Sequence, residues 1–364
     1  MFSRTDIVGG RRLMSGAKTF RELYRVENLP VFQNRMYPSK AEARGCVKGD
    51  VVLVEDSETG LVYNRAFLPE LMEYDANYQN EQGNSAIFQQ HLEWVADLIE
   101  AHLGRDELVE VGCGKGRFMA HLASRGVDVH GCDPAYEGDN PRIIRKYFSA
   151  DLGIKGQGLI LRHVLEHVQD PVSFLHNLRD ANGGGKIYVE VPCFDWICKC
   201  RTWFDVSYEH VNYFRISDFS RMFGTVYVAT HSFGGQYLSV VADLSSIRIP
   251  KIDPTDRVDF PADFIRTLER KSVDNAAVWG GASKGALFGL MMERLGIQVE
   301  TVIDINPAKQ GKFLSGTGIQ VASPKEGLAR LRDGATIYVM NSNYLPEIRA
   351  MAGDHFNYVG IDHE

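Results

Sequence analysis

The chain has 364 residues, of which 44% are hydrophobic and 24% charged, and its formal net charge is −7. This length and apolar content predict two or three globular domains with more than one core. The acidic balance and the lack of a long basic run argue against a nucleic-acid partner. No apolar run reaches the length of a membrane span, and the first residues lack the apolar core of a signal peptide.

The cysteines argue against a metal centre of the tetracysteine type and against a disulfide scaffold. None of the six forms a C-x-x-C pair; they are Cys46, Cys113, Cys132, Cys193, Cys198 and Cys200. Reduced thiols in a cytoplasmic protein are the simplest interpretation. We therefore predict no metal site and a cytoplasmic location.

Residues 1–80 predict a small mixed N-terminal domain. Short strand-like pieces lie at 51–54 and 61–63, and residues 58–60 between them are typical of a turn. From Ser85 onward, apolar residues recur at three- and four-residue spacing, which predicts an amphipathic helix.

Residues 81–245 alternate between strand and helix patterns. The predicted strands are 108–111, 127–132, 158–161, 186–191, 225–230 and 237–243, and the predicted helices are 116–125, 171–180 and 217–223. Asp170 is a good N-cap and Pro171 a good first residue for the second of these helices. The alternation predicts an α/β fold with a mainly parallel sheet covered on both faces.

A glycine-rich turn follows the first strand of this domain. Gly112 and Gly114 let the backbone turn sharply and approach a ligand. Glu110 precedes the turn, and Asp133 ends the next strand. A strand, a glycine turn and a later acid are how an open α/β sheet holds an adenosine-containing cofactor.

This E-x-G-x-G-x-G turn resembles the first motif of class I methyltransferases that use S-adenosyl-L-methionine. The resemblance implies that Glu110 accepts from the methionine ammonium and that Asp133 binds the ribose hydroxyls. Residues 159–171 resemble the "hVLEHv-DP" signature of one subfamily, in which the strand end borders the cofactor, so Arg162 and His163 are candidate cofactor contacts. We interpret Glu166 and His167 as residues that fix the loop, although they could instead belong to the site.

Residues 246–364 predict a linker over 246–260 and then a second Rossmann-like α/β unit. A strand at 277–279 leads into the glycine turn 280–285 and a helix at 286–295, and further strands are expected at 299–304 and 336–340. The second unit does not closely repeat the sequence of the first.

Three stretches together resemble the C-methyltransferases that act on nucleotide-linked keto-deoxysugars. The first is 161–171 followed by 189–192, and the second is 208–214, which matches an "EH--YF" segment. The third lies in the C-terminal unit and comprises 280–285, 304–312 and 341–344. The resemblance covers most of residues 74–360.

The family implies that a base removes a proton beside a ketone and that the resulting enolate carbon attacks the methyl group. Histidine suits a base at neutral pH, and His210 matches the catalytic histidine of the family. Glu209 could orient His210, contact substrate or brace the loop. Tyr78 falls where the family has a tyrosine facing the active site, and its hydroxyl could donate to the oxyanion.

The substrate is expected to be a small molecule contacted from the C-terminal side. Lys284 lies in a turn that resembles a phosphate-binding turn, although a purely structural glycine turn is an equal alternative. Tyr208 and Asn341 lie in the matched segments and are the other predicted substrate contacts.

Two departures from the family leave alternatives open. Thr59 and Asp56 occupy positions where the family has zinc-binding cysteines, so the N-terminal zinc module is predicted to be lost. Ser207 stands where the family has a tyrosine. O- or N-methylation of another small metabolite, and a non-catalytic protein that binds S-adenosylmethionine or a nucleotide-sugar, are the alternatives.

Overall fold

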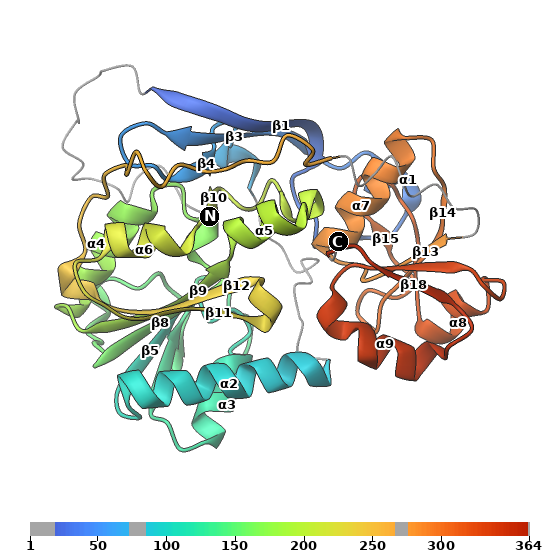
Figure 1. Cartoon of the computed structure of the whole chain (residues 1–364). Helices are drawn as coiled ribbons and strands as arrows, with labels where there is room; N and C mark the ends of the chain where they lie inside the picture. Colours follow the sequence, from blue (N-terminus) through green and yellow to red (C-terminus); the bar gives the residue numbers. More distant parts are fainter. Residues whose placement is uncertain (1–18, 73–84, 266–275, 363–364) are drawn as a thin grey trace.

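The computed structural model describes residues 19–72, 85–265 and 276–362, which form three connected parts (Figure 1). A small sheet lies over the central domain, and a second α/β unit lies beside both. The predicted α/β class is confirmed, and the central domain has a Rossmann-like, mainly parallel sheet.

The small sheet is antiparallel, with strand order β1-β3-β4-β10. The N-terminal part supplies β1 (Phe20–Pro30), β3 (Lys48–Asp56) and β4 (Val62–Asn64). The fourth strand, β10 (Asn212–Tyr213), comes from the segment directly after His210 and pairs with β4. The predicted catalytic segment is therefore anchored to the N-terminal sheet.

The turn between β3 and β4 is held by a carboxylate. Asp56 Oδ1 accepts from the backbone N–H groups of Glu58 (3.0 Å) and Thr59 (2.7 Å) and from the Thr59 hydroxyl (2.9 Å). An aspartate side chain that accepts from backbone N–H groups two and three residues later stabilises the turn. Asp56 thus fixes the turn at a position where the resembled family has a cysteine.

The central sheet has seven strands in the order β11-β12-β9-β8-β5-β6-β7. They are β5 (Leu108–Val111), β6 (Val129–Cys132), β7 (Ile143–Ile144), β8 (Gly158–Arg162), β9 (Lys186–Pro192), β11 (Val226–Ser232) and β12 (Tyr237–Asp243). Strands β5 to β9 run parallel to one another. Strand β12 is antiparallel to both of its neighbours, β9 and β11, so β11 runs in the same direction as β5 to β9. All six predicted strands are present, and the short β7 was not predicted.

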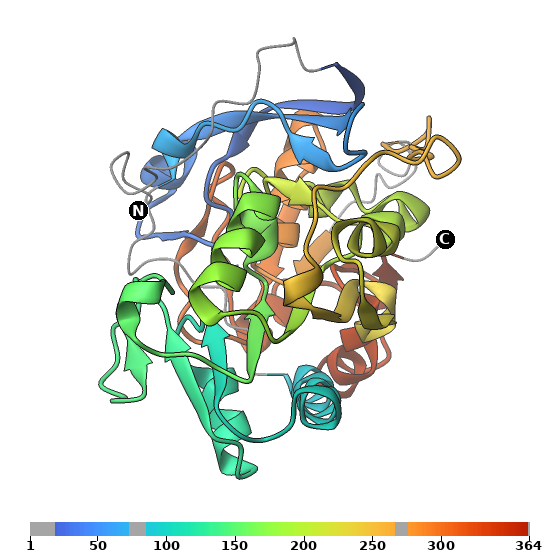
Figure 2. The same cartoon turned by 90° about the vertical axis from the view of Figure 1, so that its left-hand side faces the viewer.

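Helices cover both faces of this sheet, as predicted. They are α2 (Ala86–Leu103), α3 (Arg117–Ser124), α4 (Pro171–Asn182), α5 (Phe194–Cys200) and α6 (Ile216–Met222). Figure 1 shows α2 and α3 on one face and α4 to α6 on the other, and Figure 2 shows the latter beneath the small sheet. Ser85 caps α2 through the Phe88 N–H, and Asp170 caps α4 ahead of Pro171.

The C-terminal unit has a five-stranded parallel sheet in the order β16-β14-β13-β17-β18. Its strands are β13 (Ala276–Trp279), β14 (Val299–Ile303), β16 (Val321–Ala322), β17 (Thr336–Val339) and β18 (Asn357–Gly360). Its helices are α7 (Ser283–Arg294), α8 (Pro324–Leu328) and α9 (Leu345–Ala352). The second Rossmann-like unit is therefore present.

Shorter elements complete the chain. They are β2 (Met36–Tyr37), β15 (Phe313–Leu314), α1 (Lys40–Arg44) and the 3-10 helices η1 (Pro69–Leu71), η2 (Ala150–Leu152), η3 (Leu165–His167), η4 (Trp203–Asp205), η5 (Phe233–Gly235), η6 (Leu244–Ser246) and η7 (Ser342–Tyr344). No helix within the described ranges is long and apolar enough to cross a bilayer.

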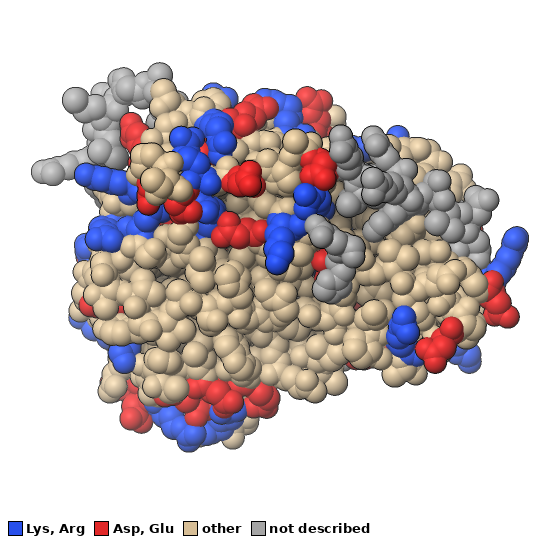
Figure 3. Space-filling view, in the orientation of Figure 1, with Lys and Arg blue, Asp and Glu red and all other residues tan. Residues whose placement is uncertain are grey.

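Strand pairing and hydrogen bonds join the three parts. β2 of the N-terminal part pairs with β15 of the C-terminal unit. The predicted linker crosses the small sheet, where Glu55 accepts from the Arg257 side chain (2.8 Å) and the Val258 N–H (3.0 Å). The face in Figure 3 carries Lys and Arg interspersed with Asp and Glu rather than a single basic area.

Candidate functional site

The glycine turn after β5 needs glycine at its first position. Gly112 has φ +74°, which disfavours a side chain. A Cβ there would lie 2.5 Å from Val164 Cγ2. The Gly112 N–H donates to the Cys132 carbonyl (2.8 Å), so the turn is tied to β6. The backbone is thereby placed at the carboxyl edge of the sheet, where open α/β sheets bind ligands.

Two carboxylates lie at this edge. Glu110 is buried, burial raises its pKa to about 7, and its Oε2 has no hydrogen-bond partner within residues 19–72, 85–265 and 276–362. Asp133 is partly exposed and accepts from the N–H groups of Gly114 (2.8 Å) and Ala135 (2.8 Å). A buried acid with one unpaired oxygen and an accessible acid beside a glycine turn suit a ligand with an ammonium group and hydroxyls.

The second glycine turn has a similar frame but a satisfied acid. Asp304 Oδ2 accepts from the Gly281 N–H (2.8 Å), as Asp133 does from Gly114. Asp304, however, is buried and pairs with Lys309 Nζ at 3.2 Å. Because the Asp304 carboxylate is already bound by Gly281 and Lys309, the first unit is the better candidate for the cofactor site.

Arg162 and His163 bind a buried glutamate, Glu190 of β9. Arg162 Nε lies 3.2 Å from Glu190 Oε2, and His163 Nε2 lies 3.0 Å from Oε1. His91 of α2 approaches the same Oε1 at 3.0 Å, and the Tyr188 hydroxyl donates to Oε2 at 2.9 Å. Arg162 and His163 are held by Glu190 in the structure, and their role as cofactor contacts stays a prediction.

The charges of this cluster are mutually stabilised. Burial by itself raises the pKa of Glu190, but Arg162 and then His163 outweigh it, and the pKa lies well below its usual value. Burial opposes protonation of His163, yet its bonds to Glu166 and Glu190 raise its pKa to about 9. The sequence analysis did not assign a role to Glu190. The available signal was a charged residue inside the apolar run 187–191, because a buried carboxylate needs cationic partners.

Two segments far apart in sequence are joined at His210. The Val211 N–H donates to the Glu166 carbonyl (2.7 Å), and His167 Nδ1 lies 2.8 Å from the Glu209 carbonyl oxygen. These bonds bring η3, at the end of β8, against the segment that precedes β10. His210 is thus placed near the carboxyl edge of the central sheet.

Glu166, His167 and His210 form one cluster. Their candidate ligand atoms all lie within 4.8 Å of one another, and the two imidazole centroids are 5.0 Å apart. Burial lowers the pKa of His210 to about 3, with His167 contributing in the same direction. The cluster therefore combines a neutral imidazole with a carboxylate, which suits either proton transfer or metal ligation.

Two predicted site residues have structural contacts. Glu209 is buried, and its Oε1 accepts from the N–H of Gln33 at 2.7 Å, so it braces the N-terminal loop. Tyr208 is fully buried, and its hydroxyl accepts from the Leu68 N–H at 2.8 Å, which is a core position rather than the predicted substrate contact. Tyr78 lies outside the described residues.

The predicted substrate contacts Lys284 and Asn341 join the two Rossmann-like parts. Lys284 Nζ pairs with Asp205 (3.0 Å) and donates to Gln236 Oε1 (3.2 Å). Asn341 exchanges two hydrogen bonds with Gln236, at 2.8 and 2.9 Å. Both side chains serve this junction, so neither forms an open anion site in this structure.

The region around Ser207 contains a different tyrosine. The Tyr213 hydroxyl accepts from the Ser207 N–H and donates to the Ser207 carbonyl, both at 3.0 Å. The Tyr213 ring lies 6.3 Å from that of His210. Tyr213 therefore contacts both the Ser207 backbone and the ring of the candidate base.

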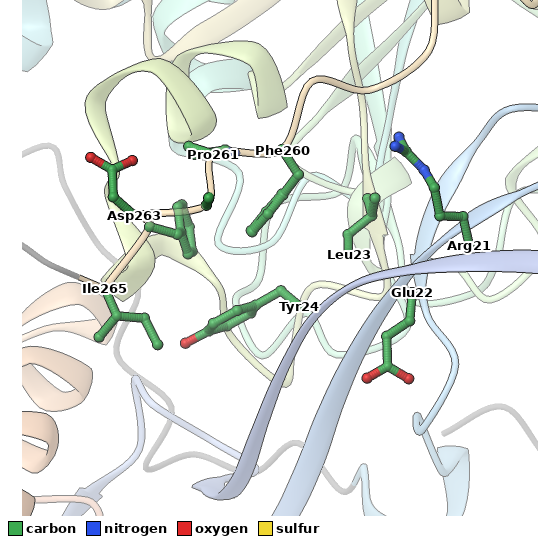
Figure 4. A pocket seen from close by; sticks show the side chains of 10 residues that line it. Arg21, Glu22, Leu23, Tyr24, Phe260, Pro261, Asp263 and Ile265 are labelled. Carbon is green, nitrogen blue, oxygen red and sulfur yellow. The ribbon is translucent and has the colours of Figure 1, made fainter.

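A separate cavity of about 500 Å³ lies between β1 and residues 260–265. Figure 4 shows the rings of Tyr24 and Phe260 turned toward each other at this cavity. Their centroids are 6.0 Å apart. None of its lining residues belongs to the glycine turn or the His210 cluster, so it is distinct from the candidate site.

Residues 80–226 match the family described as "Methyltransferase domain". No curated protein is found to match the chain.

Several solved structures are similar to part of the chain at low identity. The 1,6-didemethyltoxoflavin-N1-methyltransferase of Burkholderia thailandensis is 15% identical over 53% of this chain and 96% of its own, with a TM-score of 0.32. Magnesium protoporphyrin IX methyltransferase of Synechocystis PCC 6803, with bound S-adenosylhomocysteine, is 16% identical over 47% and 90%, with a TM-score of 0.34. The N-methyltransferase NodS of Bradyrhizobium japonicum WM9 is 13% identical over 44% and 97%, with a TM-score of 0.31.

The likeness to these structures is low, and the family match carries the assignment. Residues 80–226 are a class I methyltransferase domain, so the chain is a transferase that uses S-adenosylmethionine as its methyl donor.

Proposed function

We propose that this enzyme transfers a methyl group to a carbon of a nucleotide-linked keto sugar, with His210 as the base. The observation that carries the proposal is the placement of His210. One backbone bond and one bond from the His167 side chain join its segment to η3 at the carboxyl edge of the central sheet. The sequence stretches that resemble the keto-sugar C-methyltransferases include this same segment.

The cofactor would be held by the first glycine turn. Gly112 and Gly114 would let the backbone approach it, Glu110 would accept from its ammonium, and Asp133 would bind its ribose hydroxyls. When bound, the cofactor supplies an electrophilic methyl group. Bond formation to that methyl then requires only an electron pair on the acceptor.

His210 would generate this electron pair. A ketone acidifies the neighbouring C–H, and the imidazole nitrogen accepts that proton. The C–H electrons pass into the enolate, whose carbon forms the new bond to the methyl group while the sulfur keeps the electrons of the broken bond. A neutral imidazole is the form that can accept a proton. Burial lowers the pKa of His210, which keeps the ring neutral but also makes it a weaker base than a free imidazole.

O-methylation of another small metabolite is the second candidate. It is favoured by Ser207, which stands where the resembled family has a tyrosine, and by the group Glu166, His167 and His210, which has the composition of a metal-ligand set. An acceptor hydroxyl would then need deprotonation rather than a C–H bond.

The enolate route is tested by hydrogen exchange at carbon. The full chain with S-adenosylhomocysteine is incubated in deuterated water with nucleotide-linked keto sugars, and deuterium beside the ketone is measured by mass spectrometry. We expect catalysed exchange that falls by about 100-fold or more in His210→Ala, the scale of general base catalysis. His176→Ala, on helix α4, is the matched control. Exchange near the wild-type rate in His210→Ala would exclude His210 as the base.

A further inference from the structure

We propose that Glu166, His167 and His210 bind one divalent transition-metal ion, which the sequence analysis did not predict. Their candidate ligand atoms lie within 4.8 Å of one another. Two imidazoles and one carboxylate match the preferences of Zn²⁺, Mn²⁺, Fe²⁺ and Co²⁺. Three protein ligands leave coordination positions for water or a substrate oxygen.

The tautomer of His167 is set for ligation. Its Nδ1 lies 2.8 Å from the Glu209 carbonyl oxygen, which can only accept a hydrogen bond, so Nδ1 carries the proton. Nε2 therefore holds the lone pair. Metal-bound histidines typically donate their other ring N–H to a carbonyl or carboxylate in this way.

Glu166 supplies an independent indication of a missing partner. The residue is 1% exposed, and its Oε2 has no hydrogen-bond partner within the described part of the chain. Its other oxygen, Oε1, lies 3.4 Å from His163 Nδ1. An unpaired buried carboxylate oxygen is costly, and a cation shared with His167 and His210 would satisfy it.

Hydrogen bonds of the backbone position the three proposed metal ligands before any metal binds. The Val211 N–H bonds to the Glu166 carbonyl at 2.7 Å, and β10 continues from this point into the small sheet. Asn212 Nδ2 also donates to the carbonyls of Leu165 and Val168. His167 and His210 are partly exposed whereas Glu166 is buried, so the cluster is accessible from the imidazole side.

A metal at this position changes the chemistry available. The His210 lone pair would be used for ligation and would no longer accept a C–H proton, so the metal-bound site would serve the O-methylation candidate and not the enolate route. An acceptor hydroxyl bound to the cation would lose its proton to solvent more readily. The oxygen electron pair would then attack the methyl group. Metal binding itself does not depend on the keto-sugar proposal, because it is measured without acceptor or cofactor.

The test is metal binding to the full chain. Chelator-treated protein is titrated with Zn²⁺ by calorimetry and with Co²⁺ by visible absorption, which also reports whether thiolates are ligands. We expect one ion per chain, nitrogen and oxygen ligation, and at least about tenfold weaker binding in His167→Ala, His210→Ala and Glu166→Gln. His176→Ala should bind as the wild type does.

Circular dichroism of each variant shows whether a loss of binding reflects loss of the ligand or loss of the fold. The two histidines are partly exposed, so their variants keep the test open if Glu166→Gln does not fold. Absence of Zn²⁺ and Co²⁺ binding in the wild type, or stoichiometric binding that persists in folded His167→Ala and His210→Ala, would overturn the proposal.

Discussion

Glu110 is the residue whose protonation should report cofactor binding. Burial raises its pKa to about 7 in the ligand-free protein. If a bound ammonium lies beside it, the carboxylate form is favoured and the pKa falls on binding. Binding then releases a proton below about pH 7, so the affinity should increase as the pH rises toward that value.

We expect S-adenosylhomocysteine to bind about tenfold more tightly at about pH 8 than at about pH 6, as linkage with a pKa near 7 requires. Calorimetry in buffers of different ionisation enthalpy would measure both the affinity and the released proton. Glu110→Gln should bind more weakly at high pH and lose most of the pH dependence. An unchanged pH profile in this variant would exclude Glu110 as the ammonium contact.

Asp133 offers a second residue-scale test. Its carboxylate is partly exposed and forms no ion pair within the residues that the structure describes, so a ribose can reach it. Loss of two charge-assisted hydrogen bonds predicts that Asp133→Ala binds S-adenosylhomocysteine about 10- to 100-fold more weakly. Asp128→Ala, which removes an exposed acid paired with Arg142, is the control. Equal affinities for the two variants would contradict the ribose assignment.

At the scale of the element, the turn after β5 depends on how closely it approaches Val164. Gly112→Ala and Gly126→Ala both place a side chain at positive φ, which costs about 1 to 2 kcal/mol. A Cβ at Gly112 would also lie 2.5 Å from Val164 Cγ2, whereas one at Gly126 meets nothing within 4 Å. Gly112→Ala should therefore lower the free energy of unfolding more than Gly126→Ala.

Urea unfolding of the two glycine variants measures this difference. Adding Val164→Ala should recover part of the stability lost in Gly112→Ala but none of that lost in Gly126→Ala. If the two glycine variants are equally destabilised, the close approach is not what requires glycine at Gly112.

Strand β9 carries the charge that organises its neighbours. Glu190→Gln would leave Arg162 and two histidines around a neutral amide, and removing one partner of a buried ion pair typically costs about 3 to 5 kcal/mol. Glu22→Gln, which affects only an exposed pair with Arg25, should change stability little. Equal unfolding midpoints in urea would show that the buried cluster does not stabilise the domain.

Local patterns predicted most elements but not their partners. The glycine turn and the strand that ends near Asp133 follow from a pattern within about 25 residues, and both were predicted. The four groups around Glu190 come from α2, the end of β8, the residue that follows it, and β9, and no local spacing connects them. The pairing of β10 with β4 is equally non-local, since it joins residues 212–213 to 62–63. Lys284 and Asn341 likewise contact Gln236 in the central domain, far away in the sequence, so the pattern of the glycine turn could not predict these contacts.

At the scale of the whole molecule, one buried amide pair connects the methyltransferase domain to the C-terminal unit. Gln236, just before β12, exchanges two hydrogen bonds with Asn341, just after β17. Lys284 adds a bond to the same Gln236 oxygen. Both amides are buried, and removing Asn341 takes two hydrogen bonds from Gln236 but leaves its bonds to Lys284 (3.2 Å) and Asp362 (3.4 Å), so we expect a cost of about 1 kcal/mol.

Asn341→Ala should therefore loosen the junction without affecting the proposed cofactor site, where the candidate carboxylates lie on β5 and after β6. We expect faster amide hydrogen exchange in η7 and α9, unchanged affinity for S-adenosylhomocysteine, and a favourable coupling of about 1 kcal/mol or more between Gln236→Ala and Asn341→Ala in a double-mutant cycle. Asn357→Ala, which removes an exposed amide bond to Gly334 inside the C-terminal unit, is the control. Additive effects of the two substitutions would mean that the pair does not couple the parts. If the two residues are coupled and Asn341→Ala also weakens the binding of the acceptor, the junction is one of the elements that shape the acceptor side of the site.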